Sequence, residues 1–61
     1  MLTIMEAVQK AAAYFARRGI PSARLDAEVL LAHVLKLERI DLYIQHDRPL
    51  LRGEIDAYRK L

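Results

Sequence analysis

The first residues of the chain carry an apolar pattern that repeats every three or four positions, as on one face of a helix. The positions that share this face are Ile4, Val8, Ala11, Ala12 and Phe15. Thr3 and Glu6 precede it at the spacing of a capping box, in which each side chain accepts a hydrogen bond from the other residue's backbone N–H. Gly19 and Pro21 predict the end of the helix, because glycine tolerates a left-handed backbone and proline cannot continue a helix. The pattern predicts a first helix between Thr3 and Gly19.

A second helix is predicted from its N-cap, Ser22, to about Lys36, and it is apolar on two faces. One broad face is formed by Ala27, Leu30, Leu31, Val34 and Leu35. A second stripe, nearly opposite, is formed by Leu25, Val29 and Ala32. A helix with two apolar faces is packed on two sides. We therefore expect residues 22–36 to be the central element of the fold.

Two shorter helices are predicted in the rest of the chain. The first spans residues 37–45, with an inward-facing set at Leu37, Ile40, Tyr43 and Ile44. Its N-cap, Glu38, is a poor one, and a turn is predicted at residues 46–49. The second runs from about residue 51 to the end, with an inward-facing set at Leu51, Ile55, Tyr58 and Leu61. No glycine, asparagine or proline ends this helix, so we expect the chain to be part of a longer protein.

No alternating strand pattern competes with these helices. The expected fold class is all-α, a small bundle of four or more short helices. A chain of 61 residues is long enough for one small domain and no more. We therefore expect residues 1–61 to form a single helical domain.

The composition excludes several classes of protein. Without cysteine the chain can form no disulfide framework and no thiolate zinc site, and a cytoplasmic location is the simplest expectation. No apolar run is long enough for a membrane span, and the N-terminus lacks the pattern of a secretory signal. The two glycines are 34 positions apart and asparagine is absent, whereas a phosphate-binding loop needs several glycines close together. We expect no catalytic residue, metal site or bound cofactor here.

The charge is mildly positive, with ten Lys and Arg against eight Asp and Glu, interleaved along the chain. Three cations nevertheless gather around the first predicted turn: Arg17, Arg18 and Arg24. They are the candidate partner-binding residues, and the expected partner is an acidic protein surface or RNA. The alternative is a solvated turn whose cations complement the negative end of a helix. Tyr14, Tyr43 and Tyr58 are either partner anchors or, as we favour, core-edge residues with a hydrated hydroxyl.

Asp26, Glu28 and His33 raise the question of acid–base or metal chemistry. Asp26 and His33 are seven positions apart, about 10 Å along a helix, so they cannot meet directly. Glu28 lies on a different face of the same helix. The favoured interpretation is structural: helix capping, ion pairing or a partly buried hydrogen bond.

Helix, turn and helix follow one another over residues 3–36, the layout of a helix-turn-helix DNA-binding unit. A recognition helix needs an exposed polar face that can reach base edges. The second predicted helix is apolar on both sides, with Val-Leu-Leu-Ala in a row at residues 29–32. Direct DNA binding is therefore not expected.

The run Arg-Leu-Asp-Ala-Glu-Val-Leu-Leu-Ala-His-Val-Leu at residues 24–35, with the turn that begins at Gly19, carries a family resemblance. It resembles the N-terminal domain of the HemK/PrmC family, the protein-(glutamine-N5) methyltransferases of peptide chain release factors. Asp-Arg-Pro-Leu at residues 47–50 is similar to a turn of that family. The sequence departs from the family at residues 51–54 and at Glu38, which leaves the starts of the last two helices open.

The resemblance implies a small helical domain that recognises a release factor and precedes a methyltransferase domain. That second domain would bind S-adenosylmethionine and hold the substrate glutamine of a Gly-Gly-Gln loop with an Asn-Pro-Pro-Tyr motif. None of these catalytic or cofactor-binding residues matches a position in this chain, so the chain alone is not expected to be an enzyme, although its parent protein is. The expected partners are a release factor and the protein's own C-terminal domain. The alternatives are a free-standing helical interaction module and a small helix-turn-helix nucleic-acid binder.

Overall fold

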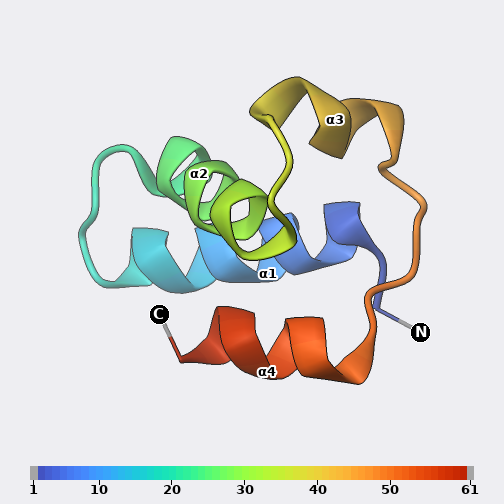
Figure 1. Ribbon diagram of the computed structural model, residues 1–61. Coiled ribbons are helices and arrows are strands. Elements are labelled where there is room, and N and C mark those ends of the chain that lie inside the picture. Colours follow the sequence, from blue (N-terminus) through green and yellow to red (C-terminus); the bar gives the residue numbers. More distant parts are fainter. Residues whose placement is uncertain (1, 61) are drawn as a thin grey trace.

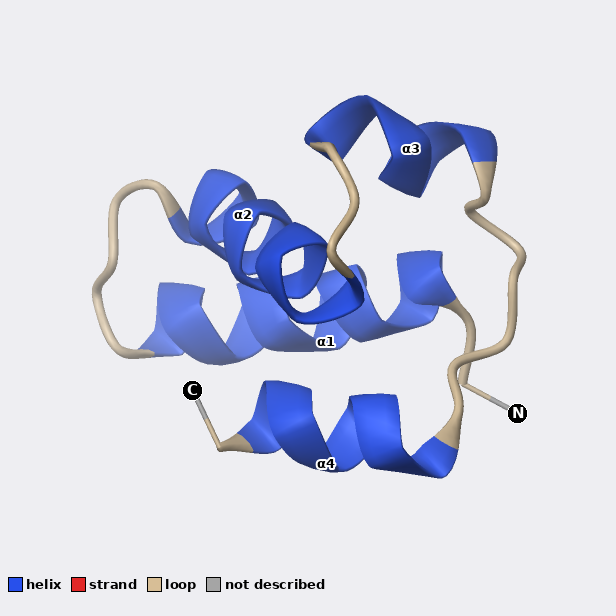
Figure 2. Ribbon diagram, in the orientation of Figure 1, coloured by secondary structure: helices blue, strands red, loops and turns tan. Residues whose placement is uncertain are grey.

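The computed structural model describes residues 2–60, which fold into four helices joined by short loops (Figures 1 and 2). The helices are α1 (Ile4–Arg17), α2 (Ala23–Leu35), α3 (Arg39–Ile44) and α4 (Arg52–Arg59). Helix α2 contacts each of the other three. The expected all-α bundle with a central second helix is confirmed. None of these four helices is long and apolar enough to cross a membrane.

Helix α1 begins and ends as its sequence predicts. The Glu6 N–H donates to Thr3 Oγ1 at 3.2 Å, and the Thr3 N–H donates to Glu6 Oε1 at 2.9 Å, which completes the capping box. At the other end Gly19 has a φ of 80°, the left-handed conformation that glycine adopts without steric cost.

The start of α1 is tied to the connection between α3 and α4. Ile4 N–H donates to the Arg48 carbonyl at 3.0 Å, and Met5 N–H donates to the His46 carbonyl at 3.0 Å. Leu50 N–H donates to the Leu2 carbonyl at 2.8 Å. The first two bonds occupy donors that a helix leaves without partners in its first turn. The turn predicted at residues 46–49 is present one position earlier, closed by the bond from the Arg48 N–H to the Gln45 carbonyl, and the chain after it meets the N-terminal segment.

The core is small and lies where α1, α2 and α3 meet the segment before α4. Its buried side chains are Ile4, Ala7, Val8, Ala27, Leu31, Ala32, Leu42 and Leu50. Phe15, Ile55 and Tyr58 pack against this cluster from its edge. The predicted inward positions of α1 and the broad apolar face of α2 are therefore borne out at the centre of the core.

The second apolar stripe of α2 differs from expectation. Ala32 is buried, but Leu25 and Val29 are exposed, so the first half of α2 is packed on one side only. Ser22 is the N-cap, but its side chain makes no capping bond; its hydroxyl instead donates to Asp26 Oδ1 at 3.2 Å.

The predicted inward face of α3 was wrong, whereas that of α4 was right in part. In α3, Ile40, Tyr43 and Ile44 are exposed, and Leu42, which the prediction omitted, is buried. The six-residue helix α3 has apolar side chains around much of its circumference, so several of its faces could pack against the core. Contact with α1 and α2 selects the face that carries Leu42. In α4, Ile55 and Tyr58 face the core as predicted, whereas Leu51 is exposed. Leu61 lies outside the described residues.

Candidate functional site

A buried carboxylate joins α2 to α3. Glu28 is only 2% exposed, and it accepts hydrogen bonds from Arg24 Nε at 2.9 Å, from Arg39 Nη2 at 2.9 Å and from the Tyr43 hydroxyl. Arg24 lies one turn before Glu28 on α2, and Arg39 and Tyr43 lie one turn apart on α3. We call these four residues the Glu28 cluster. Their interlocking bonds fix the two helices relative to each other on one side of the molecule.

The turn between α2 and α3 makes this convergence possible. Lys36 adopts a left-handed backbone, with a φ of 57°, and the Leu37 N–H donates to the Ala32 carbonyl at 2.9 Å. This ends α2 with the geometry that usually calls for glycine. The chain then turns back so that Arg39, eleven positions after Glu28, reaches the same carboxylate.

The carboxylate of the cluster remains ionised near neutral pH. Burial by itself would raise the pKa of Glu28, but hydrogen bonds from Tyr43, Arg24 and Arg39 outweigh burial and hold the pKa below its ordinary value of 4.5. The hydrogen bond between Arg24 and Glu28 also raises the pKa of the Arg24 guanidinium. The cluster therefore contains two cations and one anion, and the anion is the covered group.

The three arginines singled out in the sequence do not form one cluster. Arg24 binds Glu28 and directs its Nη2 to the Met5 Sδ at 3.3 Å, beside the first turn of α1. Arg17 and Arg18 are exposed at the opposite end of α1, about 18 Å away along a helix of that length. Arg18 lies over the Tyr14 ring, 5.6 Å from its centroid. Partner binding by these residues stays a prediction.

The tyrosines take different positions. Tyr58 is partly buried and donates its hydroxyl to the Ala27 carbonyl at 2.9 Å, and burial raises its pKa to about 12. It is a core-edge residue, as favoured, but its hydroxyl binds a backbone carbonyl where a hydrated hydroxyl was expected. Tyr43 belongs to the Glu28 cluster and Tyr14 is exposed beside Arg18.

Asp26 and His33 show no shared chemistry. Asp26 accepts a hydrogen bond from Ser22, and His33 is exposed on α2. Within residues 2–60 no group of three His, Asp or Glu side chains could hold a metal ion. Of the three residues considered for acid–base chemistry, Glu28 has the ion-pairing and hydrogen-bonding role that the favoured interpretation describes.

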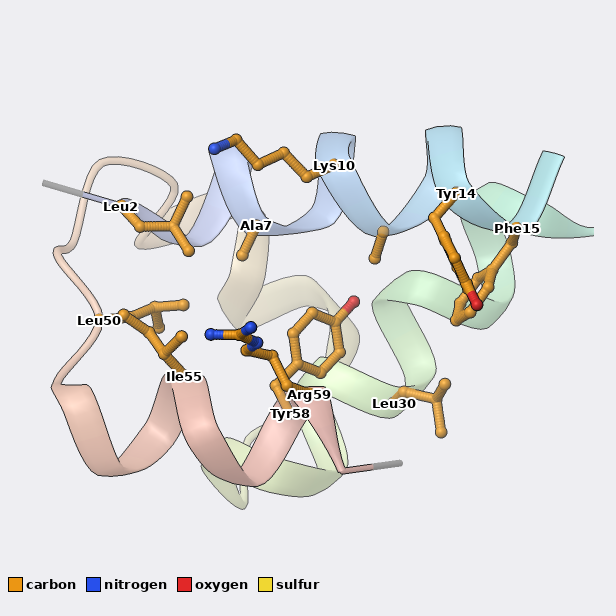
Figure 3. Close-up of a pocket in the computed structure, with 11 residues that line it drawn as sticks. Leu2, Ala7, Lys10, Tyr14, Phe15, Leu30, Leu50, Ile55, Tyr58 and Arg59 are labelled. Carbon is orange, nitrogen blue, oxygen red and sulfur yellow. The ribbon is translucent and has the colours of Figure 1, made fainter. Parts of the chain in front are cut away.

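A mainly apolar groove of about 600 Å³ separates α1 from α4 (Figure 3). The side chains that line it include Leu2, Ala11, Phe15, Leu30, Ile55 and Tyr58. A second hollow shares Phe15 and Leu30 with it and extends onto the exposed side of α2 at Leu25 and Val29. We call the first hollow the α1–α4 groove.

The sequence analysis favoured an ion-pairing or hydrogen-bonding role for Glu28 but missed Arg39 and Tyr43 as its partners. The available signal was their own spacing of four positions, which places them side by side on a helix. It could not reveal which carboxylate they meet.

Known proteins resemble this chain over nearly its whole length. The family described as the PrmC N-terminal domain matches residues 6–61. A release factor glutamine methyltransferase of Chlorobaculum tepidum is 44% identical over 57 residues, which are 93% of this chain and 19% of that protein. Proteins of the same name from Leptospira interrogans and Geobacter sulfurreducens are 43% and 39% identical, over 95% and 97% of this chain and 20% and 21% of their own length.

No solved structure matches the chain. The chain spans about one fifth of the length of these curated relatives. The match covers the capping residue Glu6, all of α2 with its Glu28 cluster, and α3 and α4. On this match the chain belongs to the PrmC N-terminal domain family.

Proposed function

We propose that this chain is the release-factor-recognition domain of an S-adenosylmethionine-dependent methyltransferase that methylates the glutamine of a Gly-Gly-Gln loop. The match of residues 6–61 to the PrmC N-terminal domain carries the proposal. The printed names of the relatives, release factor glutamine methyltransferase, support the substrate. In this account the methyl transfer, the cofactor and the catalytic residues belong to a domain that follows this chain, and the reaction takes place in the cytoplasm.

The domain would act by orientation. Methyl transfer needs the glutamine nitrogen in line with the methyl donor, and correct positioning can remove several kcal/mol of a barrier. The polar groups inside the domain serve its own fold: Glu28 binds three side chains, and the Tyr58 hydroxyl binds the Ala27 carbonyl. Its exposed surfaces are thus the parts available to a partner.

We also propose that the α1–α4 groove is covered by the part of the protein that follows this chain. Arg59, in the last turn of α4, lines the groove, so the chain leaves the domain beside it (Figure 3). The relatives are about five times longer than this chain, which provides ample polypeptide to fill the groove. If the same polypeptide also covers the second hollow, burial of Leu25 and Val29 would give α2 the second packed side that its sequence pattern predicts.

Deleting residues 1–61 from the full-length protein should raise KM for the release factor about tenfold or more, since tenfold corresponds to about 1.4 kcal/mol of binding. The dissociation constant for S-adenosylmethionine should change less than about twofold, because the deleted domain holds the substrate protein rather than the cofactor. Steady-state methylation of a purified release factor and calorimetric titration with S-adenosylmethionine measure the two quantities.

The same kinetic assay with a short Gly-Gly-Gln peptide is the control. The peptide lacks the rest of the release factor, so the deletion should leave its methylation rate nearly unchanged. An unchanged KM for the intact release factor, or an equal loss of cofactor binding, would refute the proposed division of labour. A gene that encodes no Asn-Pro-Pro-Tyr motif after residue 61 would refute it as well.

A further inference from the structure

Two large aliphatic side chains stand on the outer face of α3. Ile40 is 63% exposed and Ile44 is 69% exposed. They are four positions apart, so they form one ridge along the helix. Leu42 occupies the inward side of α3, which turns this ridge away from the core. Single exposed aliphatic residues are common on protein surfaces, but this ridge lies beside arginines whose carboxylate partner is buried.

Arg39 and Tyr43 of the Glu28 cluster lie on one flank of the ridge, and Arg24 meets them at the Glu28 carboxylate. The side chains of Arg24 and Arg39 are about half exposed, while the carboxylate that holds them is covered. A partner would therefore meet two guanidinium groups and no opposing exposed charge in the cluster. Among residues 2–60, Nη1 of each arginine has no hydrogen-bond acceptor and is available to a new one.

The nearest carboxylate on α3 does not cancel this charge at the ridge. Asp41 lies on the flank of α3 away from Arg39 and Tyr43, and it accepts a hydrogen bond from the Glu38 N–H at 3.1 Å. The ridge thus has a cationic side toward α2 and an acidic residue on its far side. A carboxylate on a partner would be attracted to the cationic side only.

The Glu28 cluster also fixes these side chains before binding. Arg39 is held through both Nε and Nη2, and Tyr43 through its hydroxyl. Side chains that are already ordered lose less conformational entropy when a partner binds. Arginine and tyrosine are the residue types that most often dominate binding energy at protein interfaces, and adjoining apolar contacts exclude water from them.

We propose that this surface of α2 and α3 binds the release factor at a segment that places a carboxylate between apolar side chains. The surface, called the α2–α3 surface below, consists of Arg24, Arg39, Ile40, Tyr43 and Ile44. The inference rests on the proposed function of the domain. The carboxylate would bind the free guanidinium N–H groups, and the apolar side chains would cover the ridge. Helices α3 and α4 make no contact and lie apart, so the α1–α4 groove stays free for the rest of the protein (Figure 1).

The Ile40→Asp substitution in the full-length protein should lower kcat/KM for the release factor about tenfold, the loss expected of an interface hot spot. The change should appear in KM, with S-adenosylmethionine affinity unchanged. Aspartate suits the first turn of a helix, so α3 should still form. Ile44→Gln, which adds no charge, is the second variant and should shift KM in the same direction.

Because the contact includes ion pairs, KM of the unmodified protein should rise with salt concentration.

Leu51→Asp is the matched control. Leu51 is 66% exposed, lies at the N-cap of α4 outside both surfaces, and aspartate is a favoured N-cap residue. Its kcat/KM should match that of the unmodified protein.

If Ile40→Asp and Ile44→Gln behave like Leu51→Asp while deletion of residues 1–61 still raises KM, the α2–α3 surface is not the binding face although the proposed function stands. If the deletion leaves KM unchanged, the proposed function itself fails. An unchanged KM in Ile40→Asp, with a loss of thermal stability in the full-length protein that residues 1–61 alone do not show, would assign the surface to the protein's own downstream domain and overturn the inference.

Discussion

The Leu31→Ala variant is expected to lose about 3 kcal/mol of unfolding free energy, within the range for buried leucine truncations. Leu31 is fully buried at the centre of the cluster formed by α1, α2 and α3. A domain of this length has a total stability of roughly 3–9 kcal/mol. The variant should therefore unfold at a clearly lower temperature and urea concentration than the unmodified chain, which thermal or urea denaturation followed by circular dichroism will measure.

Leu25→Ala is the control for this experiment. It makes the same chemical change on the same helix, but Leu25 is 43% exposed. Its truncation leaves no enclosed cavity, so its cost should stay below about 1 kcal/mol. Equal destabilisation by the two substitutions would mean that the core does not lie on the face of α2 described above.

The Glu28→Ala variant should be the next most destabilised, by about 2 kcal/mol, because the carboxylate accepts hydrogen bonds from three side chains at once, two of them charged. The loss stays below that of a fully buried ion pair, since both arginines are half exposed and can be hydrated after the substitution. Glu54→Ala removes a partly buried ion pair with one guanidinium, Arg48, together with the capping bond from the Leu51 N–H, and should cost less than Glu28→Ala, about 1 kcal/mol. Equal costs would show that the second guanidinium of the Glu28 cluster adds nothing to a single ion pair.

The pH dependence gives this prediction a definite sign. The pKa of Glu28 in the folded chain lies below its ordinary value of 4.5, so folding favours the ionised form. The stabilisation is complete above that ordinary value and is lost as the pH falls through the lower folded-state pKa. The stability difference between the unmodified protein and Glu28→Gln should be constant above about pH 5.5 and shrink below about pH 4.5. Glu6, whose pKa is also lowered by its bonds to Thr3, is present in both proteins and cancels in the difference.

Local signals predicted much of this fold from sequence. The capping box of Thr3 and Glu6 and the left-handed Gly19 depend on residues within a few positions of one another, and both are present. The broad apolar face of α2 has enough periodic positions to define its direction. Where a local rule determines the geometry, sequence reasoning was sufficient.

Tertiary contacts decided the rest. Nothing local distinguishes Leu42 from Ile40 or Ile44 as the inward residue of α3; packing against α1 and α2 does. Nothing local marks Lys36 for a left-handed backbone, yet that turn brings Arg39 to Glu28. The candidate site was therefore only partly visible. Arg24 was predicted to bind a partner, which stays a prediction, whereas Arg39 and Tyr43, which meet it at Glu28, come from a helix whose orientation the sequence pattern did not specify.

The central claim is that this domain contacts a peptide chain release factor, and a nuclear magnetic resonance titration of the ¹⁵N-labelled chain with unlabelled release factor tests it most directly. We predict selective loss of amide signal intensity on α3, around Ile40, Tyr43 and Ile44, with the signals of α4 changed least. Loss centred on Arg17 and Arg18 would support recognition through the other basic end of the domain. Amide signals that remain unchanged throughout, at release factor concentrations well above KM of the full-length enzyme, would contradict the claim.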